Sequence, residues 1–202
     1  MFENSYQFIT AGIVLGLSAG FSPGPLFTLV LAQTIKHNSF EGIKVAISPL
    51  ITDLPILLSV FWIYNKFSKF HFIIALISFS GGFFLAYLGI ESLKVKGLDM
   101  NDKNINSGSI KKGIITNFLS PNPYLFWTAV GIPLLFKAYE NSFITAALFL
   151  FSFYTILIGS KVIVAMIAGR AKMVMNQKIY IIIMRILGFF LLVFSLIFFY
   201  DS

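Results

Sequence analysis

The chain has 202 residues, of which 57% are hydrophobic and only 11% are charged, and its mean hydropathy is +0.87. Soluble domains carry about 25% charged residues, so this composition offers too little polar surface to cover a water-exposed globule. The chain has no cysteine, which excludes disulfides, thiol redox chemistry and thiolate metal sites. The net charge of +7 does not indicate a nucleic-acid partner, because most basic residues lie in short loops beside apolar segments, where membrane orientation explains them.

Six apolar stretches reach the roughly 20 residues that a helix needs to span a bilayer. They lie at about 6–33, 42–64, 71–92, 113–136, 143–168 and 179–200. The sequence therefore predicts an all-α, polytopic membrane protein with six transmembrane helices. The first stretch has no basic region before it and runs past the length of a signal-peptide core, so we expect it to be retained as a helix.

The basic residues predict the orientation of these helices. The loops after the first, third and fifth stretches carry ten of them: Lys36, Lys44, Lys94, Lys96, Lys103, Lys111, Lys112, Arg170, Lys172 and Lys178. The loops on the other side carry three, which are Lys66, Lys69 and Lys137. Because cytoplasmic loops are enriched in Lys and Arg, both termini are predicted to lie outside the cytoplasm.

Two similar motifs interrupt the first stretch of each half of the chain. "FSPGPLF" (21–27) and "LSPNPYLF" (119–126) share Ser-Pro-x-Pro at an offset of 98 residues. Three helices in each half would insert the second half upside down relative to the first, as in the inverted repeats of secondary transporters. The predicted organisation is a first repeat, a polar cytoplasmic linker and a second repeat within one membrane domain, at 1–93, 94–112 and 113–202.

These motifs predict a polar site inside the membrane. Proline has no N–H, so the two pairs would free the carbonyls of Ala19, Phe21, Asn117 and Leu119, and bare carbonyls are tolerated in a bilayer only beside protein or a water-filled cavity. The alternative is that the prolines only kink the helices. The predicted substrate-binding or gating residues are Ser22, Pro23, Gly24, Pro25, Asn117, Ser120, Pro121, Asn122 and Pro123.

Two charged residues lie within predicted spans and are candidates for a proton or charge site. Asp53 is near the middle of the second stretch, where an ionisable group is costly and is functional by default, as a proton carrier or as an anchor for a substrate ammonium. Lys161 in the fifth stretch could instead form a structural ion pair with Asp53, or extend to the membrane surface. No metal-ligand cluster and no cofactor motif appears in the sequence.

Other features are interpreted as structural. Gly12, Gly16, Gly20 and Gly24 recur at every fourth position, which predicts a smooth helix face for close packing of another helix. Glu91, Arg185, His37 and His71 lie at or near helix ends and are predicted to be interfacial or solvated. The aromatic residues predicted to be interface anchors are Trp62, Tyr64, Trp127 and Tyr200.

Together these residues resemble the LysE/RhtB family of bacterial amino-acid exporters, along nearly the whole chain. The matching positions are Ser-Pro-Gly-Pro at 22–25, Gly42 and Asp53, "NFLSPNPYLFW" at 117–127, and Gly188. The chain departs from the family at Leu26, Ser48, Thr52 and Ser120-Pro121-Asn122, which surround the predicted site. The substrate could therefore differ from the family's better-known amino acids.

The resemblance implies proton-driven efflux of amino acids or similar small metabolites across the bacterial inner membrane. The residues favour a secondary transporter that works by alternating access, with a small-molecule substrate, a lipid bilayer around it and no cofactor. A homo-oligomer is left open. The alternatives are a transporter of another solute such as a metal ion, a membrane-embedded enzyme, and a structural subunit without a solute path. The scarcity of intramembrane His and acidic residues weighs against an enzyme.

Overall fold

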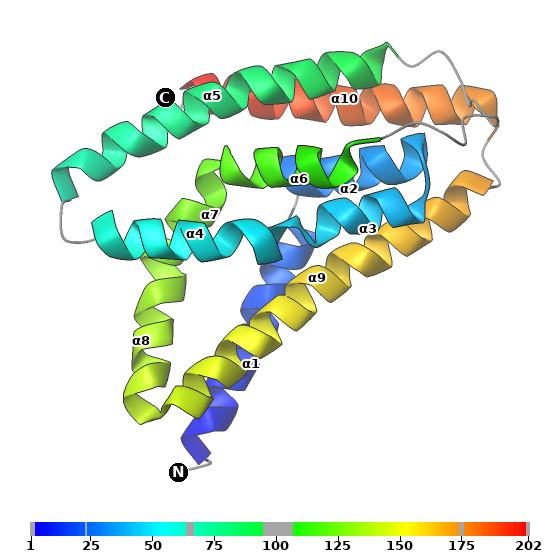
Figure 1. Ribbon diagram of the computed structural model, residues 1–202. Helices are drawn as coiled ribbons and strands as arrows, with labels where there is room; N and C mark the ends of the chain where they lie inside the picture. The colour runs from blue at the N-terminus through cyan, green and yellow to red at the C-terminus, as the bar shows by residue number, and fades with distance from the viewer. Residues whose placement is uncertain (1–2, 23, 64–66, 95–106, 174–175, 201–202) are drawn as a thin grey trace.

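A computed structural model describes residues 3–22, 24–63, 67–94, 107–173 and 176–200 (Figure 1). All regular structure in these residues is helical, so the predicted all-α class is confirmed. The elements in chain order are α1 (Glu3–Phe21), α2 (Pro25–Lys36), α3 (Ser39–Ala46), α4 (Ser48–Ile63), α5 (Phe67–Leu93), α6 (Ser109–Phe118), α7 (Pro121–Phe126), the π-helical segment η1 (Trp127–Gly131), α8 (Ile132–Asn141), α9 (Phe143–Met173) and α10 (Gln177–Tyr200).

Four prolines mark the points at which helices begin. Pro25 and Pro121 are the first residues of α2 and α7, and Pro49 and Pro133 are the second residues of α4 and α8. A helix tolerates proline there because the first N–H groups have no partner within the helix. The chain bends by 60° between α1 and α2. The predicted span 6–33 is therefore two helices joined at its Pro-x-Pro motif.

Other predicted spans are also divided. The stretch 42–64 consists of α3 and α4, which meet at Ile47, and the stretch 113–136 consists of α6, α7, η1 and α8. Among the described residues, three helical stretches are long and apolar enough to cross a membrane, and a fourth results if α1 and α2 form one bent span. The three stretches are Ser39–Ser59, Phe143–Lys172 and Gln177–Tyr200.

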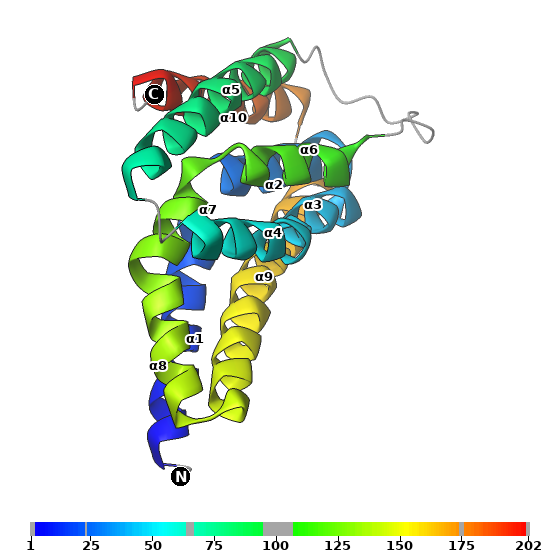
Figure 2. The same ribbon diagram turned by 60° about the vertical axis from the view of Figure 1, so that its left-hand side comes forward.

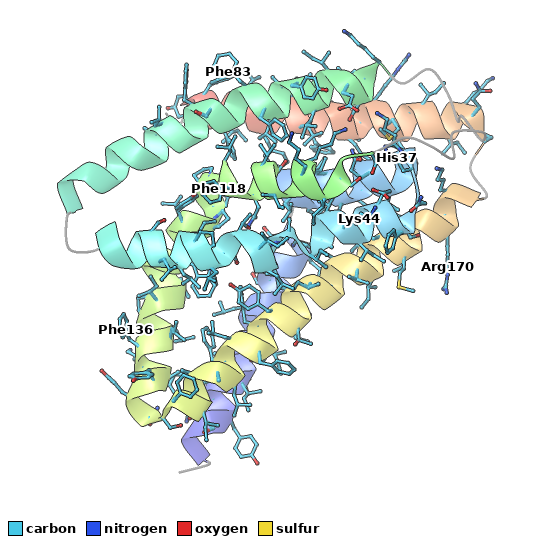
Figure 3. All side chains as sticks on the ribbon, in the orientation of Figure 1. His37, Lys44, Phe83, Phe118, Phe136 and Arg170 are labelled. Carbon is cyan, nitrogen blue, oxygen red and sulfur yellow. The ribbon has the colours of Figure 1, made fainter. Side chains whose placement is uncertain are left out.

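The helices form two long pairs with the shorter helices between them. Figures 1 and 2 show α5 and α10 side by side along one edge of the molecule, while α1 and α9 run together toward the N-terminus. The shorter helices α2, α3, α4, α6 and α7 lie between these pairs. Phe83 and Phe136 lie on outer faces of α5 and α8 (Figure 3) and are largely exposed, as expected of side chains that face lipid.

The glycine face predicted for the first helix packs against α9. Gly12, Gly16 and Gly20 are buried, and a Cβ at any of them would meet atoms of α9 at less than the distance that real Cβ atoms keep. A Cβ at Gly24 would have nothing within 4 Å. The packing prediction is confirmed for the first three glycines and wrong for Gly24, because Gly24 lies after the end of α1 at the bend.

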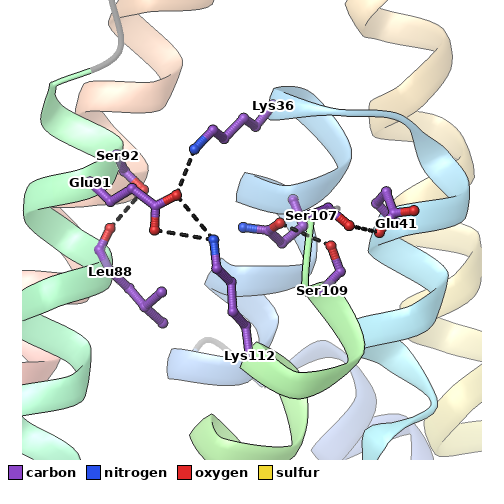
Figure 4. A network of polar contacts seen from close by, with 9 residues as sticks. Lys36, Glu41, Leu88, Glu91, Ser92, Ser107, Ser109 and Lys112 are labelled. Carbon is purple, nitrogen blue, oxygen red and sulfur yellow. Dashed lines mark hydrogen bonds and ion pairs between the residues drawn. The ribbon is translucent and has the colours of Figure 1, made fainter. Parts of the chain in front are cut away.

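An ion-pair network joins α2, α5 and α6 at one end of the molecule (Figure 4). The Glu91 carboxylate accepts hydrogen bonds from Lys36 Nζ at 2.6 Å and from Lys112 Nζ at 3.0 and 3.1 Å. Burial and the neighbouring Lys36 and Lys112 ammonium groups lower the pKa of the half-buried His37. The positive charge around Glu91 at neutral pH therefore comes from lysines.

Neighbouring polar contacts extend this network to α3. Ser109 Oγ donates to Gln33 Oε1 at 3.0 Å, and Ser107 Oγ donates to the Glu41 carboxylate (Figure 4). The start of α6 is thus tied both to the end of α2 and to the start of α3. Since α2, α3 and α5 belong to the first half of the chain and α6 to the second, these contacts connect the two halves.

Glu91→Gln is expected to lower stability by about 1 kcal/mol, because two partly buried lysine ammonium groups lose their counter-charge. The measurement is the thermal midpoint of unfolding of the purified protein in detergent. Added salt should shrink the difference between the variant and the wild type, since salt screens the ion pairs. Glu140→Gln is the control, because Glu140 is exposed on α8 and takes part in none of the ion pairs of the described residues. A salt-independent effect of Glu91→Gln would contradict the prediction.

Candidate functional site

A cavity of about 470 Å³ lies where α1, α2, α4, α6, α7 and α9 meet. Residues of both halves of the chain line it, including both sides of each Pro-x-Pro break. The lining residues are Leu15, Ser18, Ala19, Ser22, Gly24, Pro25, Leu26, Phe27, Pro49, Asp53, Asn117, Ser120, Asn122, Pro123, Phe126, Trp127, Val130, Phe153, Leu157 and Lys161. The wall is thus mainly apolar, with a few polar groups and two charged side chains.

Asp53 lies on α4 and is held by three side chains from the second half. Asn117 Nδ2 donates to Asp53 Oδ1 at 3.1 Å, while Trp127 Nε1 and the Tyr154 hydroxyl donate to Oδ2 at 3.4 and 3.1 Å. Asn117 Nδ2 also donates to Thr52 Oγ1 at 2.6 Å. These donors fix the orientation of a carboxyl group that is only 5% exposed.

The breaks in the helices explain how this group reaches the cavity. The chain turns at Ile47, and α4 then starts at Ser48 and Pro49 and carries Asp53 past the cavity wall. On the other side, α6 ends at Phe118, so Asn117 lies at its last turn and faces Asp53. The Ser120 hydroxyl caps α7 by accepting from Asn122 N–H at 3.3 Å. Asn117 and Ser120 therefore lie at or beside a helix end, whereas Tyr154 reaches Asp53 from within α9.

Lys161 is buried in α9 and binds backbone carbonyls of the first break. Its Nζ donates to Ala19 O at 2.9 Å and to Gly20 O at 3.0 Å. The residue is 4% exposed, so it does not extend to the membrane surface. Lys161 and Asp53 form no ion pair within the described residues. The structure therefore shows neither the ion pair with Asp53 nor the extension to the membrane surface. Lys161 instead donates to carbonyls at the end of α1.

The freed carbonyl predicted at Ala19 is thus already occupied. Pro23 cannot donate to it, and the Lys161 ammonium takes the place of the missing N–H. At the second break Asn117 O accepts from Ser120 N at 3.3 Å, and Phe118 O accepts from the Tyr124 hydroxyl at 3.0 Å. These carbonyls are satisfied by the protein itself, as a low-dielectric environment requires.

The structure brings most of the predicted site residues together around the cavity. Those that line it are Ser22, Gly24, Pro25, Asn117, Ser120, Asn122, Pro123, Asp53 and Lys161. Pro121 is buried at the first position of α7 and does not line the cavity. Pro23 lies outside the described residues. The two motifs therefore face one space, although they are 98 residues apart in the chain.

Two partners of Asp53 were not expected from the sequence. Trp127 is 1% exposed and donates to Asp53, so its assignment as an interface anchor is wrong. Tyr154 had no assigned role, although a tyrosine in the middle of an apolar stretch is a signal, because a buried phenol needs a hydrogen-bond partner. Trp127 also begins the π-helical segment η1, a distortion that is common at functional sites. No group of three His, Asp or Glu side chains that could hold a metal ion occurs among the described residues.

Long apolar helices, a cavity between them and two buried ionisable side chains that line it define a multi-pass membrane protein with a polar site between its helices. The family model described as LysE type translocator matches residues 17–202, so the chain belongs to this family. The protein is therefore a membrane exporter of small solutes and not an enzyme. The resemblance seen in the sequence is confirmed. No curated protein and no solved structure matches the chain.

Proposed function

We propose that the cavity binds an amino acid or a similar small metabolite, and that the protein exports it across the bacterial inner membrane by proton-coupled alternating access. The observation that carries this proposal is the pair of buried charges. Asp53 and Lys161 both line the cavity but do not pair with each other. A solute carboxylate would satisfy Lys161, the apolar wall would accommodate a side chain, and Asp53 would take up and release the coupling proton.

The proposed transport path is the cavity between the two breaks. Half-helices whose ends face a central site are typical of secondary transporters. In this chain α2 starts at Pro25 and α7 at Pro121, and Gly24, Pro25 and Ser120 line the cavity. The proposed binding or gating residues are therefore residues 22–25, Asn117 and residues 120–123, and Asp53 is the proposed proton carrier.

The proposed architecture is six spans arranged as a 3+3 inverted repeat. In this repeat, α1 and α2 correspond to the segments from α6 to α8. The helices α3 and α4 correspond to α9, and α5 corresponds to α10. The helix contacts support this correspondence. The contact of α1 with α9 is matched by the contact of α6 with α3 and α4, and α5 packs on its own counterpart α10. The repeats would be 1–93 and 113–202, with 94–112 as the cytoplasmic linker and both termini outside.

The test is a comparison of solute release. Cells that overproduce the protein should release at least one amino acid or related metabolite faster than cells that lack it. The purified protein in liposomes should then transport that solute against its gradient when a proton gradient is imposed. Release profiles that do not differ, over a broad metabolite panel, would contradict the proposed function. Release that is insensitive to dissipation of the proton gradient would contradict the coupling alone.

A further inference from the structure

Lys161 is a buried cation whose partners leave part of its hydrogen-bonding capacity unused. An ammonium group has three donors, and two of them go to Ala19 O and Gly20 O. No carboxylate among the described residues lies within ion-pair distance of Nζ, and Asp53, which lines the same cavity, acts on Lys161 only through space. A cation at this depth is costly without a counter-charge. The side chain lines the cavity, so a solute in the cavity can supply that counter-charge.

The surroundings of Lys161 also favour an anion. The helix α2 begins at Pro25 beside the cavity, and its N-cap residue Gly24 supplies no side-chain cap. The first N–H groups of a helix have no partner within the helix, and they carry a partial positive charge. Leu26 and Phe27, in this first turn, both line the cavity. The first turn of α2 and the Lys161 side chain therefore both border the cavity.

We infer that Lys161 binds the carboxylate of the transported solute, so that the cavity selects solutes with a carboxylate and rejects solutes with an excess of positive charge. This inference rests on the proposed function and deepens it. The carbonyls of the first break hold Lys161, so they are not available to a substrate ammonium. Within the lining, Asp53 is the acidic side chain and Lys161 the basic one, so a second cation on the solute would meet no additional counter-charge.

The competing explanation is that Lys161 only caps the C-terminal end of α1. Basic side chains commonly bond to the last carbonyls of a helix, and Lys172 does so elsewhere on α9, where its Nζ donates to His37 O at 2.6 Å and Lys36 O at 3.4 Å. Lys172 is half-buried and does not line the cavity. It is therefore a matched control that shares the carbonyl contacts but not the position.

Three related probes test the contributions of the carboxylate and of the amine to binding separately. They are leucine, isocaproate (leucine without the amine) and isoamylamine (leucine without the carboxylate). Binding to the purified full-length protein in detergent is followed by the fluorescence of Trp127, in a Trp62→Phe background that leaves Trp127 as the single tryptophan. Leucine and isocaproate should bind at least about tenfold more tightly than isoamylamine, because a charge-assisted hydrogen bond is worth about that factor or more. Norleucine should bind more tightly than lysine, which adds an ammonium to the same skeleton.

Lys161→Gln removes the charge but keeps an amide donor for the carbonyls. It should weaken isocaproate binding about tenfold or more and remove the preference over isoamylamine. Lys161→Arg and Lys172→Gln should keep the preference. Because the preference is a ratio measured on one preparation, it does not depend on the fraction of folded protein. An unchanged preference in Lys161→Gln would show a capping role only and would overturn the inference.

The inference and the proposed function can fail separately. Failure of isocaproate to bind, or binding of isoamylamine as tight as that of leucine, would overturn the inference even if export is observed. Selective carboxylate binding that depends on Lys161, together with release profiles that do not change, would overturn the proposed function and leave the inference standing.

Discussion

Asp53→Asn is expected to reduce solute transport driven by a proton gradient to the level of liposomes without protein. Asparagine has nearly the volume of aspartate but cannot take up and release a proton in the relevant pH range. The variant also keeps an oxygen that can accept from Asn117, Trp127 or Tyr154, the three donors to Asp53 in the wild type. The measurement is initial uptake or release in proteoliposomes with an imposed proton gradient.

A second measurement on this variant separates a proton carrier from a substrate-binding group. Exchange of labelled for unlabelled solute across the membrane needs no net proton movement, so Asp53→Asn should retain it if Asp53 carries the proton. Tyr154→Phe is the matched control, because it removes one hydrogen bond to Asp53 and leaves the carboxyl group. Gradient-driven transport should persist in this control. Unimpaired gradient-driven transport by Asp53→Asn would refute the proton-carrier role, and loss of both activities would assign Asp53 to substrate binding.

Gly16→Ala is expected to destabilise the protein by about 1–3 kcal/mol, the usual cost of inserting a methyl group into a closely packed interior. A Cβ at Gly16 would lie 2.7 Å from Phe153 O and 3.2 Å from Leu157 N, both backbone atoms of α9, and 3.0 Å from Ile156 Cβ. Backbone atoms cannot rotate away, so α1 and α9 would have to separate. The measurement is the thermal midpoint of unfolding in detergent, which should fall by several degrees.

The control for this substitution lies on the partner helix. A Cβ at Gly159 of α9 would have nothing within 4 Å, so Gly159→Ala should be neutral or slightly stabilising, because alanine is the better helix former. The two variants make the same chemical change in neighbouring helices and differ in the space around it. Equal thermal midpoints for the two would show that α1 and α9 do not pack as closely as the structure has them.

Features that depend on local chemistry could be read from the sequence. The scarcity of charge identifies a membrane protein, because a bilayer does not supply the polar contacts that water does. The missing N–H of Pro25 and Pro121 identifies the two breaks, and α2 and α7 start at these residues. The spacing of Gly12, Gly16 and Gly20 identifies a packing face. Each of these properties belongs to a short segment and needs no knowledge of the rest of the chain.

Features that depend on partners far apart in the chain could not be predicted. The cost of a carboxyl group in a membrane makes Asp53 a candidate, but its donors Asn117, Trp127 and Tyr154 come from the other half of the chain. The frequency of tryptophan at membrane interfaces predicts an interface anchor at Trp127, whereas the packing of the helices makes it a buried donor. The interruption between α3 and α4 at Ile47 is likewise not predicted by the sequence, although Ser39–Ser59 remains one stretch long and apolar enough to cross a membrane.

The first break shows most clearly the difference between what local chemistry determines and what tertiary packing determines. The sequence alone determined that Pro23 leaves the Ala19 carbonyl without its usual helical donor, since this follows from the covalent structure of proline. What then occupies that carbonyl was decided by the tertiary structure, in which the bend after α1 and the close contact of α1 with α9 bring the Lys161 ammonium to Ala19 and Gly20. A buried acceptor must be satisfied, but the choice among donors follows from the packing of helices that are far apart in the chain.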